Sequence, residues 1–200
     1  MNGWMQLYQS KLTTAEKAVS AIRSGMRLFL TGNCSVPQRV MAALVQRAPQ
    51  FDSPIEMAHV LTIGSADYVA PGMEKYIRVN ALFISANVRQ AVNEGRADFT
   101  PCFLSEIPSL FRNGILPLDV ALIQVSPPDE HGFCSFGVEI GVTKTAAETA
   151  KIVIAEVNDR MPRTLGDSFI HVSKLTHIVP VSYPLPEHRM SDITELEKKI

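Results

Sequence analysis

The sequence predicts an α/β fold with an open, doubly wound, mainly parallel sheet that is flanked by helices. Two short, almost continuous apolar runs, at residues 119–125 and 151–157, have the pattern of strands that are covered on both faces. Such runs alternate at least five times with segments whose apolar residues recur at helical spacing. The alternation contains no internal repeat or low-complexity tract and is typical of right-handed strand–helix–strand units.

The composition is that of one well-packed domain. The chain has 200 residues, of which 46% are hydrophobic and 20% are charged, so it can bury a large core. Its 19 basic and 20 acidic residues provide no basic surface for nucleic acid or an anionic membrane. The sequence has no apolar stretch as long as a bilayer span, and residues 1–11 lack the hydrophobic centre of a signal peptide. We therefore expect a cytoplasmic protein without nucleic-acid or membrane partners.

The cysteines and histidines do not predict a disulfide framework or a metal site. Cys34, Cys102 and Cys134 are odd in number and form no C-x-x-C motif, so reduced thiols are expected. The five histidines lack metal-ligand spacing such as H-E-x-x-H, and no metal is predicted. His59, inside a predicted strand, is interpreted as a core histidine with a hydrogen-bond partner.

Each element is predicted from apolar spacing and from the residues at its ends. Strands are expected at residues 26–30, 55–61, 77–84, 119–125 and 151–157, with shorter β-like runs at 169–172 and 177–181. A short amphipathic segment is expected at residues 4–8, and helices at 13–22, 37–48, 85–92, 105–111 and 144–150. Thr13 and Glu16 form a capping box, Ser85 is interpreted as an N-cap, and Asn113 with Gly114 marks a helix end.

The C-terminal part is predicted to lead out of this domain. Residues 184–186 read Pro-Leu-Pro, which is typical of a linker, and a charged helix is expected to begin at Ser191. We therefore expect residues 1–183 to form one domain. Residues 184–200 are expected to form a linker and the start of a helix that leads to a second domain.

Polar loops follow four of the predicted strands, at residues 32–35, 62–67, 85–89 and 126–132. Because the carboxyl ends of parallel strands meet at one edge of a sheet, we expect these loops to converge on a ligand site. The first loop contains Gly32 and precedes a helix, so its N–H groups suit a phosphate, a carboxylate or a developing oxyanion. The sequence has neither G-x-G-x-x-G nor a Walker loop, and no dinucleotide or nucleoside triphosphate site is predicted.

The fourth loop marks an abrupt change from a buried strand to a polar turn. Its side chains Asp129, Glu130 and His131 can exchange or share protons, and Gly132 permits a tight turn with positive φ. The alternative is a solvated loop without a chemical role, since turn propensity alone accounts for the prolines, Asp129 and Gly132.

Six segments together give the sequence a specific resemblance to a known family. They are AVNEGRAD at residues 91–98, FLSEIP at 103–108, DVALIQVSPPDEHG at 119–132, AEVN at 155–158, MPR at 161–163 and HVS at 171–173. On these segments the chain resembles the N-terminal half of the acetyl-CoA hydrolase/transferase family, which includes 4-hydroxybutyrate and succinyl-CoA:acetate CoA-transferases. The resemblance extends over nearly the whole chain.

The resemblance implies a pair of similar open α/β domains with the active site in the cleft between them. It also implies a glutamate nucleophile, acyl-CoA and CoA as substrates, and no bound cofactor. In the family, that glutamate and the loop that stabilises the oxyanion lie in the second domain, without a counterpart in residues 1–200. Glu94, Glu106, Glu130 and Glu156 lie in family segments but do not match the position of the nucleophile. No catalytic residue is therefore assigned.

By position, the resemblance assigns the first and fourth loops to the cleft, where they hold the acyl group or the carboxylate. The substrate-binding candidates are Gly32, Asn33, Cys34, Ser35, Ser126, Pro127, Asp129, His131 and Gly132, with Thr62, Ser85, Asn87 and Arg89 from the second and third loops. Cys34 is interpreted as a nucleophile or as a packed or lining thiol, and the sequence places no histidine close to it that could activate a nucleophile. His131 is either an acid or base or a structural turn residue. Arg89 either binds a phosphate or faces solvent.

Three functions follow from these observations. The first is half of a CoA-transferase that uses a glutamyl-CoA intermediate and a small carboxylate of the acetate, butyrate or 4-hydroxybutyrate type; with water as acceptor it is a hydrolase. The second is a non-catalytic module that binds CoA esters or small carboxylates. The third, a nucleotide-binding oxidoreductase domain, is disfavoured by the missing glycine fingerprint.

For the first function, the CoA-transferase half, we expect a second domain in the same chain or in another subunit. A homo-oligomer is also expected, because an open half-domain interface exposes apolar surface.

Overall fold

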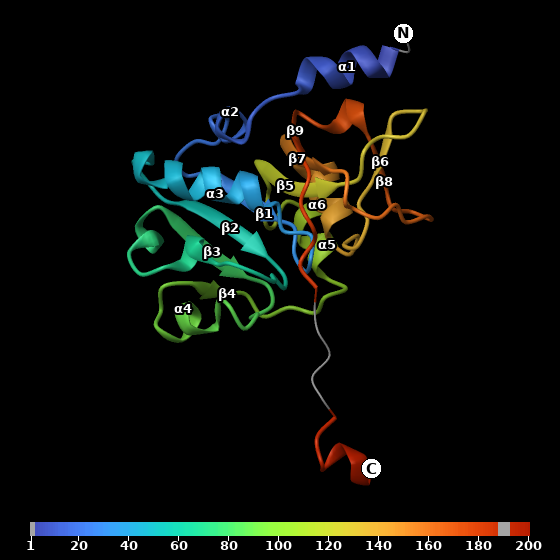
Figure 1. The fold of residues 1–200 in the computed structure, drawn as a ribbon. Helices are drawn as coiled ribbons and strands as arrows, with labels where there is room; N and C mark the ends of the chain where they lie inside the picture. The colour runs from blue at the N-terminus through green and yellow to red at the C-terminus, as the bar shows by residue number, and fades with distance from the viewer. Residues whose placement is uncertain (1–2, 188–192) are drawn as a thin grey trace.

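The fold is a seven-stranded parallel sheet with helices on both faces, which confirms the predicted class (Figure 1). The computed structural model describes residues 3–187 and 193–200. The strand order across the sheet is β4-β3-β2-β1-β5-β7-β9. The strands are β1 (Arg27–Leu30), β2 (Ile55–His59), β3 (Ile77–Ala81), β4 (Asp98–Phe99), β5 (Val120–Val125), β7 (Ile152–Asn158) and β9 (His177–Val181). A separate antiparallel pair is formed by β6 (Phe133–Ser135) and β8 (Phe169–His171).

The order of the strands in the sheet reverses direction between β1 and β5. The chain first adds β2, β3 and β4 on one side of β1, and then adds β5, β7 and β9 on the other side. β1 and β5 are neighbours in the sheet, with Leu28 beside Val120 and Leu30 beside Leu122. Such a switch point is where open α/β sheets commonly bind ligands, at the carboxyl ends of the strands.

Helices cover the two faces of the sheet differently. The helices are α1 (Gly3–Lys11), α2 (Ala15–Val19), α3 (Gln38–Arg47), α4 (Arg89–Asn93), α5 (Ile107–Arg112) and α6 (Thr143–Thr149). Short 3-10 helices occur at η1 (Ala48–Gln50), η2 (Asp67–Val69), η3 (Met73–Lys75), η4 (Val172–Lys174) and η5 (Glu197–Lys199). One face of the sheet packs against α2, α3 and α4, and the other packs against α5, α6 and α1 with the small β6–β8 sheet (Figure 1). Within the described residues, no helix combines the length and apolar character needed to cross a membrane.

Strand β5 shows why the central strands have continuous apolar sequences. All six of its residues are buried. Leu122 packs into the core beneath α3, whereas Ala121 and Ile123 pack into the core that α1 and β6 complete. Burying one large aliphatic side chain contributes about 1.5–3 kcal/mol, so a strand that fills two cores anchors both layers.

Two of the predicted helix caps are wrong. The hydroxyl of Thr14 caps α2 by accepting a hydrogen bond from a first-turn amide at 3.3 Å. Thr13 is extended instead, and its amide donates to the Ile178 carbonyl at 2.9 Å. Ser85 does not cap α4, because the helix starts further along the chain and the Ser85 hydroxyl donates to Asn87 at 2.6 Å.

Strands β4 and β6 were not predicted from the sequence. β4 has two exposed residues within a polar segment, so no apolar alternation marks it. β6 has three residues and lies in the segment that reads as a turn. Its strand conformation depends on antiparallel pairing of Phe133 with His171, a partner that is distant along the chain.

The C-terminal prediction falls partly outside the described residues. Ser191, where a charged helix was expected to begin, is not among them. In residues 193–200 the helical structure is the 3-10 helix η5. The domain boundary at residues 184–186 stays a prediction.

Helix α1 is held by the turn that follows β5. The Trp4 indole nitrogen donates a hydrogen bond to the Glu130 carbonyl at 3.0 Å. Gly132 has φ +86°, and a Cβ there would lie 2.8 Å from His171 Nε2 and 2.9 Å from Trp4 Cγ. The turn therefore requires glycine both for its backbone conformation and for its close packing.

Replacing Gly132 with alanine tests this packing. Gly132→Ala should lower the free energy of unfolding by about 3 kcal/mol, because left-handed strain and overpacking add. Gly166→Ala is the matched control: its φ is +89° and no atom lies near the added Cβ, so only strain remains and the loss should be about 1 kcal/mol. Urea unfolding followed by circular dichroism measures both. Equal losses would contradict the packing role.

Candidate functional site

The first two polar loops cross at the carboxyl ends of β1 and β2. The Asn33 amide donates to the Leu61 carbonyl at 2.6 Å, and Asn33 forms a β-bridge with Thr62. A Cβ on Gly32 would lie 2.1 Å from the Leu61 oxygen, so the crossing exists only because residue 32 is glycine. Asn33 itself has φ +49°, a left-handed conformation that asparagine tolerates better than most residues.

The side chain of Asn33 connects this crossing to the segment before α6. Its Nδ2 donates to Glu139 Oε2, and both side chains are partly buried. Nearby, the hydroxyls of Thr31 and Thr143 lie 2.8 Å apart in a buried hydrogen bond. The first loop is thus attached to the face of the sheet that carries α5 and α6.

The second and third loops meet in a cluster of hydroxyl and amide groups. The hydroxyls of Thr62 and Ser85 donate to Asn87 Oδ1 at 3.2 and 2.6 Å. The Thr62 hydroxyl also lies 3.0 Å from the Tyr68 hydroxyl, and Asn87 Nδ2 donates to the Gly64 carbonyl at 3.3 Å. Burial raises the pKa of Tyr68 to about 12, so its hydroxyl stays protonated near neutral pH. The hydroxyl and amide groups thus bond to one another, and the cluster joins the second and third loops through neutral side chains.

A groove of about 1200 Å³ opens beside the crossing of the loops. Gly32, Asn33 and Glu139 contribute to its lining, which is otherwise largely apolar. Phe103 and Leu104 also line it and are 75% and 65% exposed. An open apolar groove with a few polar groups at one end accommodates an elongated molecule with an apolar and a polar part.

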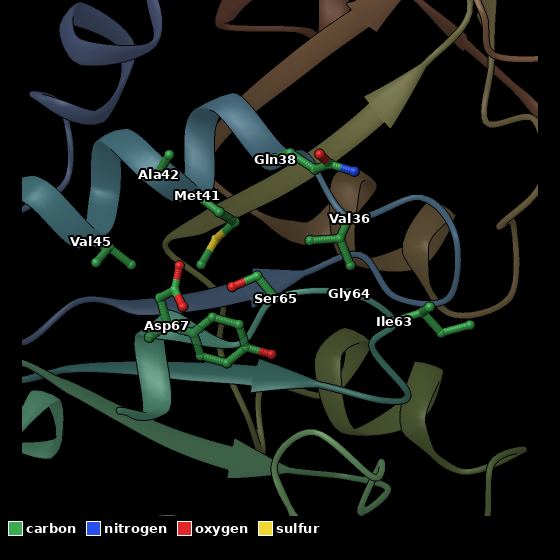
Figure 2. Close-up of a pocket in the computed structure, with 10 residues that line it drawn as sticks. Val36, Gln38, Met41, Ala42, Val45, Ile63, Gly64, Ser65 and Asp67 are labelled. Carbon is green, nitrogen blue, oxygen red and sulfur yellow. The ribbon is translucent and has the colours of Figure 1, made fainter. Parts of the chain in front are cut away.

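A second cavity, of about 400 Å³, lies on the opposite side of the first loop. Figure 2 shows Met41 and Val45 extending from α3 toward the segment that carries Ser65 and Asp67. Val36, at the end of the first loop, forms another part of its wall. The first loop therefore separates two hollows, one on each face of the sheet.

Glu156 on β7 is a fully buried carboxylate at this end of the sheet. Its Oε1 accepts a hydrogen bond from the Val40 amide in the first turn of α3 at 2.6 Å, and its Oε2 accepts one from the Tyr183 hydroxyl. Burial raises the pKa of Glu156 to about 6, although the hydrogen bonds from Tyr183, Val40 and Arg39 oppose this shift. The group therefore titrates closer to neutrality than an ordinary glutamate.

The structure brings most of the predicted residues of the first three loops close together, with the side chain of Arg89 as the exception. Gly32, Asn33, Thr62, Ser85 and Asn87 belong to the crossing and the cluster described above. Cys34 is partly buried in the turn that follows, and Ser35 is buried with its hydroxyl donating to the Gln124 carbonyl at 3.5 Å. Arg89 is exposed as the first residue of α4.

The predicted residues of the fourth loop form a separate structure. The Ser126 hydroxyl accepts a hydrogen bond from the Ser135 amide at 2.9 Å. Asp129 Oδ1 accepts hydrogen bonds from the His131 and Phe133 amides, both at 2.9 Å. Asp129 Oδ2 pairs with Arg163, while Pro127 and the side chain of His131 are exposed. Among the described residues, no hydrogen bond links this turn to the crossing of the first two loops.

Three contributors to the groove were not identified from the sequence. Glu139 lies in a short segment between two glycines that carries no motif of its own. Phe103 and Leu104 begin one of the segments on which the family resemblance rests, and two adjacent large apolar residues outside any predicted strand or helix were the available signal.

Comparison with known families and proteins gives one consistent result. The sequence model described as "Acetyl-CoA hydrolase/transferase N-terminal domain" matches residues 3–184. A 4-hydroxybutyrate coenzyme A transferase from Clostridium kluyveri is 50% identical over 197 residues, which are 98% of this chain and 46% of that protein. A succinyl-CoA:acetate/propanoyl-CoA:succinate CoA transferase from Fasciola hepatica is 38% identical over 94% of this chain and 39% of that protein. The chain thus spans less than half the length of these relatives.

A solved structure has the same fold. The crystal structure of a 4-hydroxybutyrate CoA-transferase from Porphyromonas gingivalis superimposes with a TM-score of 0.79 and 36% sequence identity. The match covers 92% of this chain and 43% of that one. The predicted α/β class and the predicted family resemblance are both confirmed.

The raised pKa of Glu156 predicts a pH dependence of stability. The folded state holds this proton more tightly than the unfolded chain, so the contribution of Glu156 to the free energy of unfolding falls as pH rises from about 4.5 through about 6. Between about pH 4.5 and pH 7, the wild-type protein should lose about 2 kcal/mol relative to Glu156→Gln. Urea unfolding of both proteins across this range measures the difference.

Glu94→Gln serves as the control, because hydrogen bonds from Gln90 and Arg96 lower the pKa of Glu94. Its contribution to stability is present above the ordinary glutamate pKa and is lost as pH falls, so this variant should change the pH dependence in the opposite direction. A wild-type protein and a Glu156→Gln variant with parallel curves would show that burial does not raise this pKa.

Proposed function

The chain belongs to the acetyl-CoA hydrolase/transferase family, and on this premise we propose that it is the N-terminal half of an acyl-CoA:carboxylate CoA-transferase. The observation that carries the proposal is the 50% identity to a 4-hydroxybutyrate coenzyme A transferase over 98% of this chain. The substrates we propose are an acyl-CoA thioester and a small carboxylate of the acetate, butyrate or 4-hydroxybutyrate type. The complete enzyme would include a second domain, in the same chain or in another subunit, and would assemble as a homo-oligomer.

The proposed reaction uses a glutamate of that second domain as its nucleophile. The glutamate carboxylate attacks the thioester carbonyl, the carbon–sulfur bond breaks, and an acyl–glutamyl anhydride and CoA thiolate form. The thiolate then attacks the glutamyl carbonyl, which releases the donor carboxylate and leaves a glutamyl-CoA thioester. The acceptor carboxylate and the thiolate repeat these two steps in reverse order, which forms the new acyl-CoA and regenerates the glutamate.

The residues of this chain would bind and orient the substrates in that reaction. The groove lined by Phe103 and Leu104 suits the apolar part of an acyl-CoA. Asn33 lines the polar end of the groove and offers a neutral hydrogen-bonding group there, and Thr62 adjoins Asn33 through the β-bridge of the crossing. Glu139 lines the groove, but its Oε2 accepts a hydrogen bond from Asn33, and we assign it the role of fixing that side chain.

Hydrolysis is the second candidate function, since the matched family includes acetyl-CoA hydrolases. In that case water, in place of a carboxylate, would attack the glutamyl-CoA thioester and release free CoA. The groove is open to solvent on this chain, so the second domain would have to exclude water for transfer to dominate.

A fusion protein, called the joined protein below, tests the proposal. This chain would be fused to the C-terminal part of the Clostridium kluyveri 4-hydroxybutyrate coenzyme A transferase that lies beyond the matched region. With acetyl-CoA as donor, we expect CoA transfer to butyrate or 4-hydroxybutyrate in the joined protein and no turnover by this chain alone. Release of free CoA at the same rate without a carboxylate would favour the hydrolase. Binding of acetyl-CoA without turnover would indicate a binding module, and neither binding nor turnover would contradict the proposal.

Gly32→Ala in the joined protein tests the crossing of the loops. The added Cβ would collide with the Leu61 carbonyl and force the first loop away from the second. Since a displacement of about 1 Å can cost about 100-fold in rate, kcat/KM should fall by about 100-fold. Gly25→Ala, at φ +76° with only Ser53 Oγ nearby at 3.8 Å, should reduce stability but leave kcat/KM unchanged. Equal kcat/KM values for the two variants would contradict a role of the loop crossing in substrate binding or catalysis.

A further inference from the structure

Buried polar side chains form a cluster on the α3 face of the sheet, which the groove does not reach. The cluster consists of Gln124 on β5, Glu156 and Asn158 on β7, and Tyr183 in the segment after β9; we call it the exit cluster. Gln124 and Glu156 are neighbours in the register of the sheet, and the first three side chains are fully buried. The proposed chemistry uses none of these groups, so their burial needs another explanation.

Tyr183 is the centre of the exit cluster. Its hydroxyl donates to Glu156 and accepts hydrogen bonds from Gln124 Nε2 at 3.0 Å and from the Gln38 amide at 3.1 Å. Its carbonyl accepts a hydrogen bond from Asn158 Nδ2 at 2.9 Å, and its amide donates to Asn158 Oδ1 at 3.4 Å. One residue therefore attaches the segment after β9 to β5, β7 and α3.

The exit cluster also holds the downstream end of the first site loop. Gln124 Nε2 donates to the Val36 carbonyl at 3.1 Å, and Glu156 Oε1 accepts from the Val40 amide at 2.6 Å. The N-cap of α3 is Pro37, which has no side-chain acceptor for the first-turn amides. The exit cluster supplies these missing partners, so the loop and the start of α3 depend on Tyr183 and its neighbours.

The polar character of the exit cluster indicates a role in orientation. Buried ionisable groups are often less stabilising than apolar residues of similar volume. Hydrogen bonds are directional, however, and a fully connected network fixes the relative positions of the groups that it joins. Here those groups are a site loop, a helix N-terminus and the segment through which the chain leaves the sheet.

We propose that Tyr183 is a positioning residue that makes residues 32–36 and residues 182–187, which follow β9, move as one unit. The inference rests on the proposed function, in which that segment leads to the second domain and the loop lines the substrate groove. Any displacement of the second domain would then be transmitted to the loop through Tyr183 and Gln124. The geometry of the groove would depend on where the second domain sits.

Hydrogen–deuterium exchange in this chain tests the positioning without requiring any activity. Tyr183→Phe removes the hydroxyl that bonds Glu156, Gln124 and the Gln38 amide. We expect amides in residues 33–40 to exchange at least 10-fold faster, while amides in β2 and β3 are unchanged. Tyr76→Phe is the matched control, because within the described part of the chain no hydrogen bond involves the Tyr76 hydroxyl. It should leave exchange in residues 33–40 at the wild-type rate.

The kinetic arm uses the same two variants in the joined protein. Tyr183→Phe should lower kcat about 10-fold with little change in KM for acetyl-CoA, because the polar end of the groove at Gly32 and Asn33 is misplaced while its apolar lining remains. Tyr76→Phe should leave both constants unchanged. An inactive wild-type joined protein would count against the proposed function alone, and the exchange arm would still decide the role of Tyr183.

Two results would overturn the proposal. One is unchanged exchange in residues 33–40 of a folded Tyr183→Phe chain, or an increase spread uniformly over all amides. The other is an active joined protein whose kcat does not respond to Tyr183→Phe. If Tyr183→Phe does not fold, Gln124→Met removes the donor to Val36 and to Tyr183 with similar volume, and the same local increase in exchange is expected from it.

Discussion

The contact between residue 32 and the Leu61 carbonyl is the constraint on which the candidate site depends. A side chain at residue 32 would occupy the place of that carbonyl, since a Cβ there would lie 2.1 Å from its oxygen. Here glycine removes the side chain, and the Asn33 amide donates to the same carbonyl at 2.6 Å. The contact sets the backbone of Asn33, directs its amide side chain toward Glu139, and brings Thr62 beside the first loop. The polar end of the groove results from these positions.

The two faces of the sheet differ in the side chains that surround the first loop. On the α5 and α6 side, large apolar residues such as Phe103 remain exposed around a groove that a ligand or a second domain can cover. On the α3 side, Gln124, Glu156 and Tyr183 form a connected network of hydrogen bonds beside the start of α3. The first loop lies between these two environments and is attached to both. This arrangement explains how a loop with a glycine and a left-handed asparagine keeps one conformation.

The predictable part of the structure is the part that local sequence determines. The continuous apolar runs at residues 119–125 and 151–157 are strands buried on both faces, and the loops after β1, β2 and β3 meet at one edge because parallel strands require it. The path of the fourth loop was not predictable in this way. Its direction is set by pairing of β6 with β8 and by the ion pair of Asp129 with Arg163, whose partners lie far along the chain.

Most residues that line the groove were not predicted either, because tertiary packing and not local sequence brings them together. Glu139, Phe103 and Leu104 come from segments without periodicity, and only the packing of α5 and α6 onto the sheet brings them together. The exit cluster could not be foreseen either, because Tyr183 follows the last strand and its partners are single polar residues inside apolar runs. The apolar pattern of such a run indicates that its polar residues are buried. Their hydrogen-bond partners become known only from the tertiary contacts.

An NMR titration of the isotope-labelled chain with acetyl-CoA tests the candidate site most directly, because it reports where the substrate binds. We expect the backbone amide shifts of residues 32–35, 62–64 and 102–105 and of Glu139 to change together and to saturate with one dissociation constant. Shifts confined to residues 126–132 and α1, or no saturable shift in the groove, would contradict the assignment of the site.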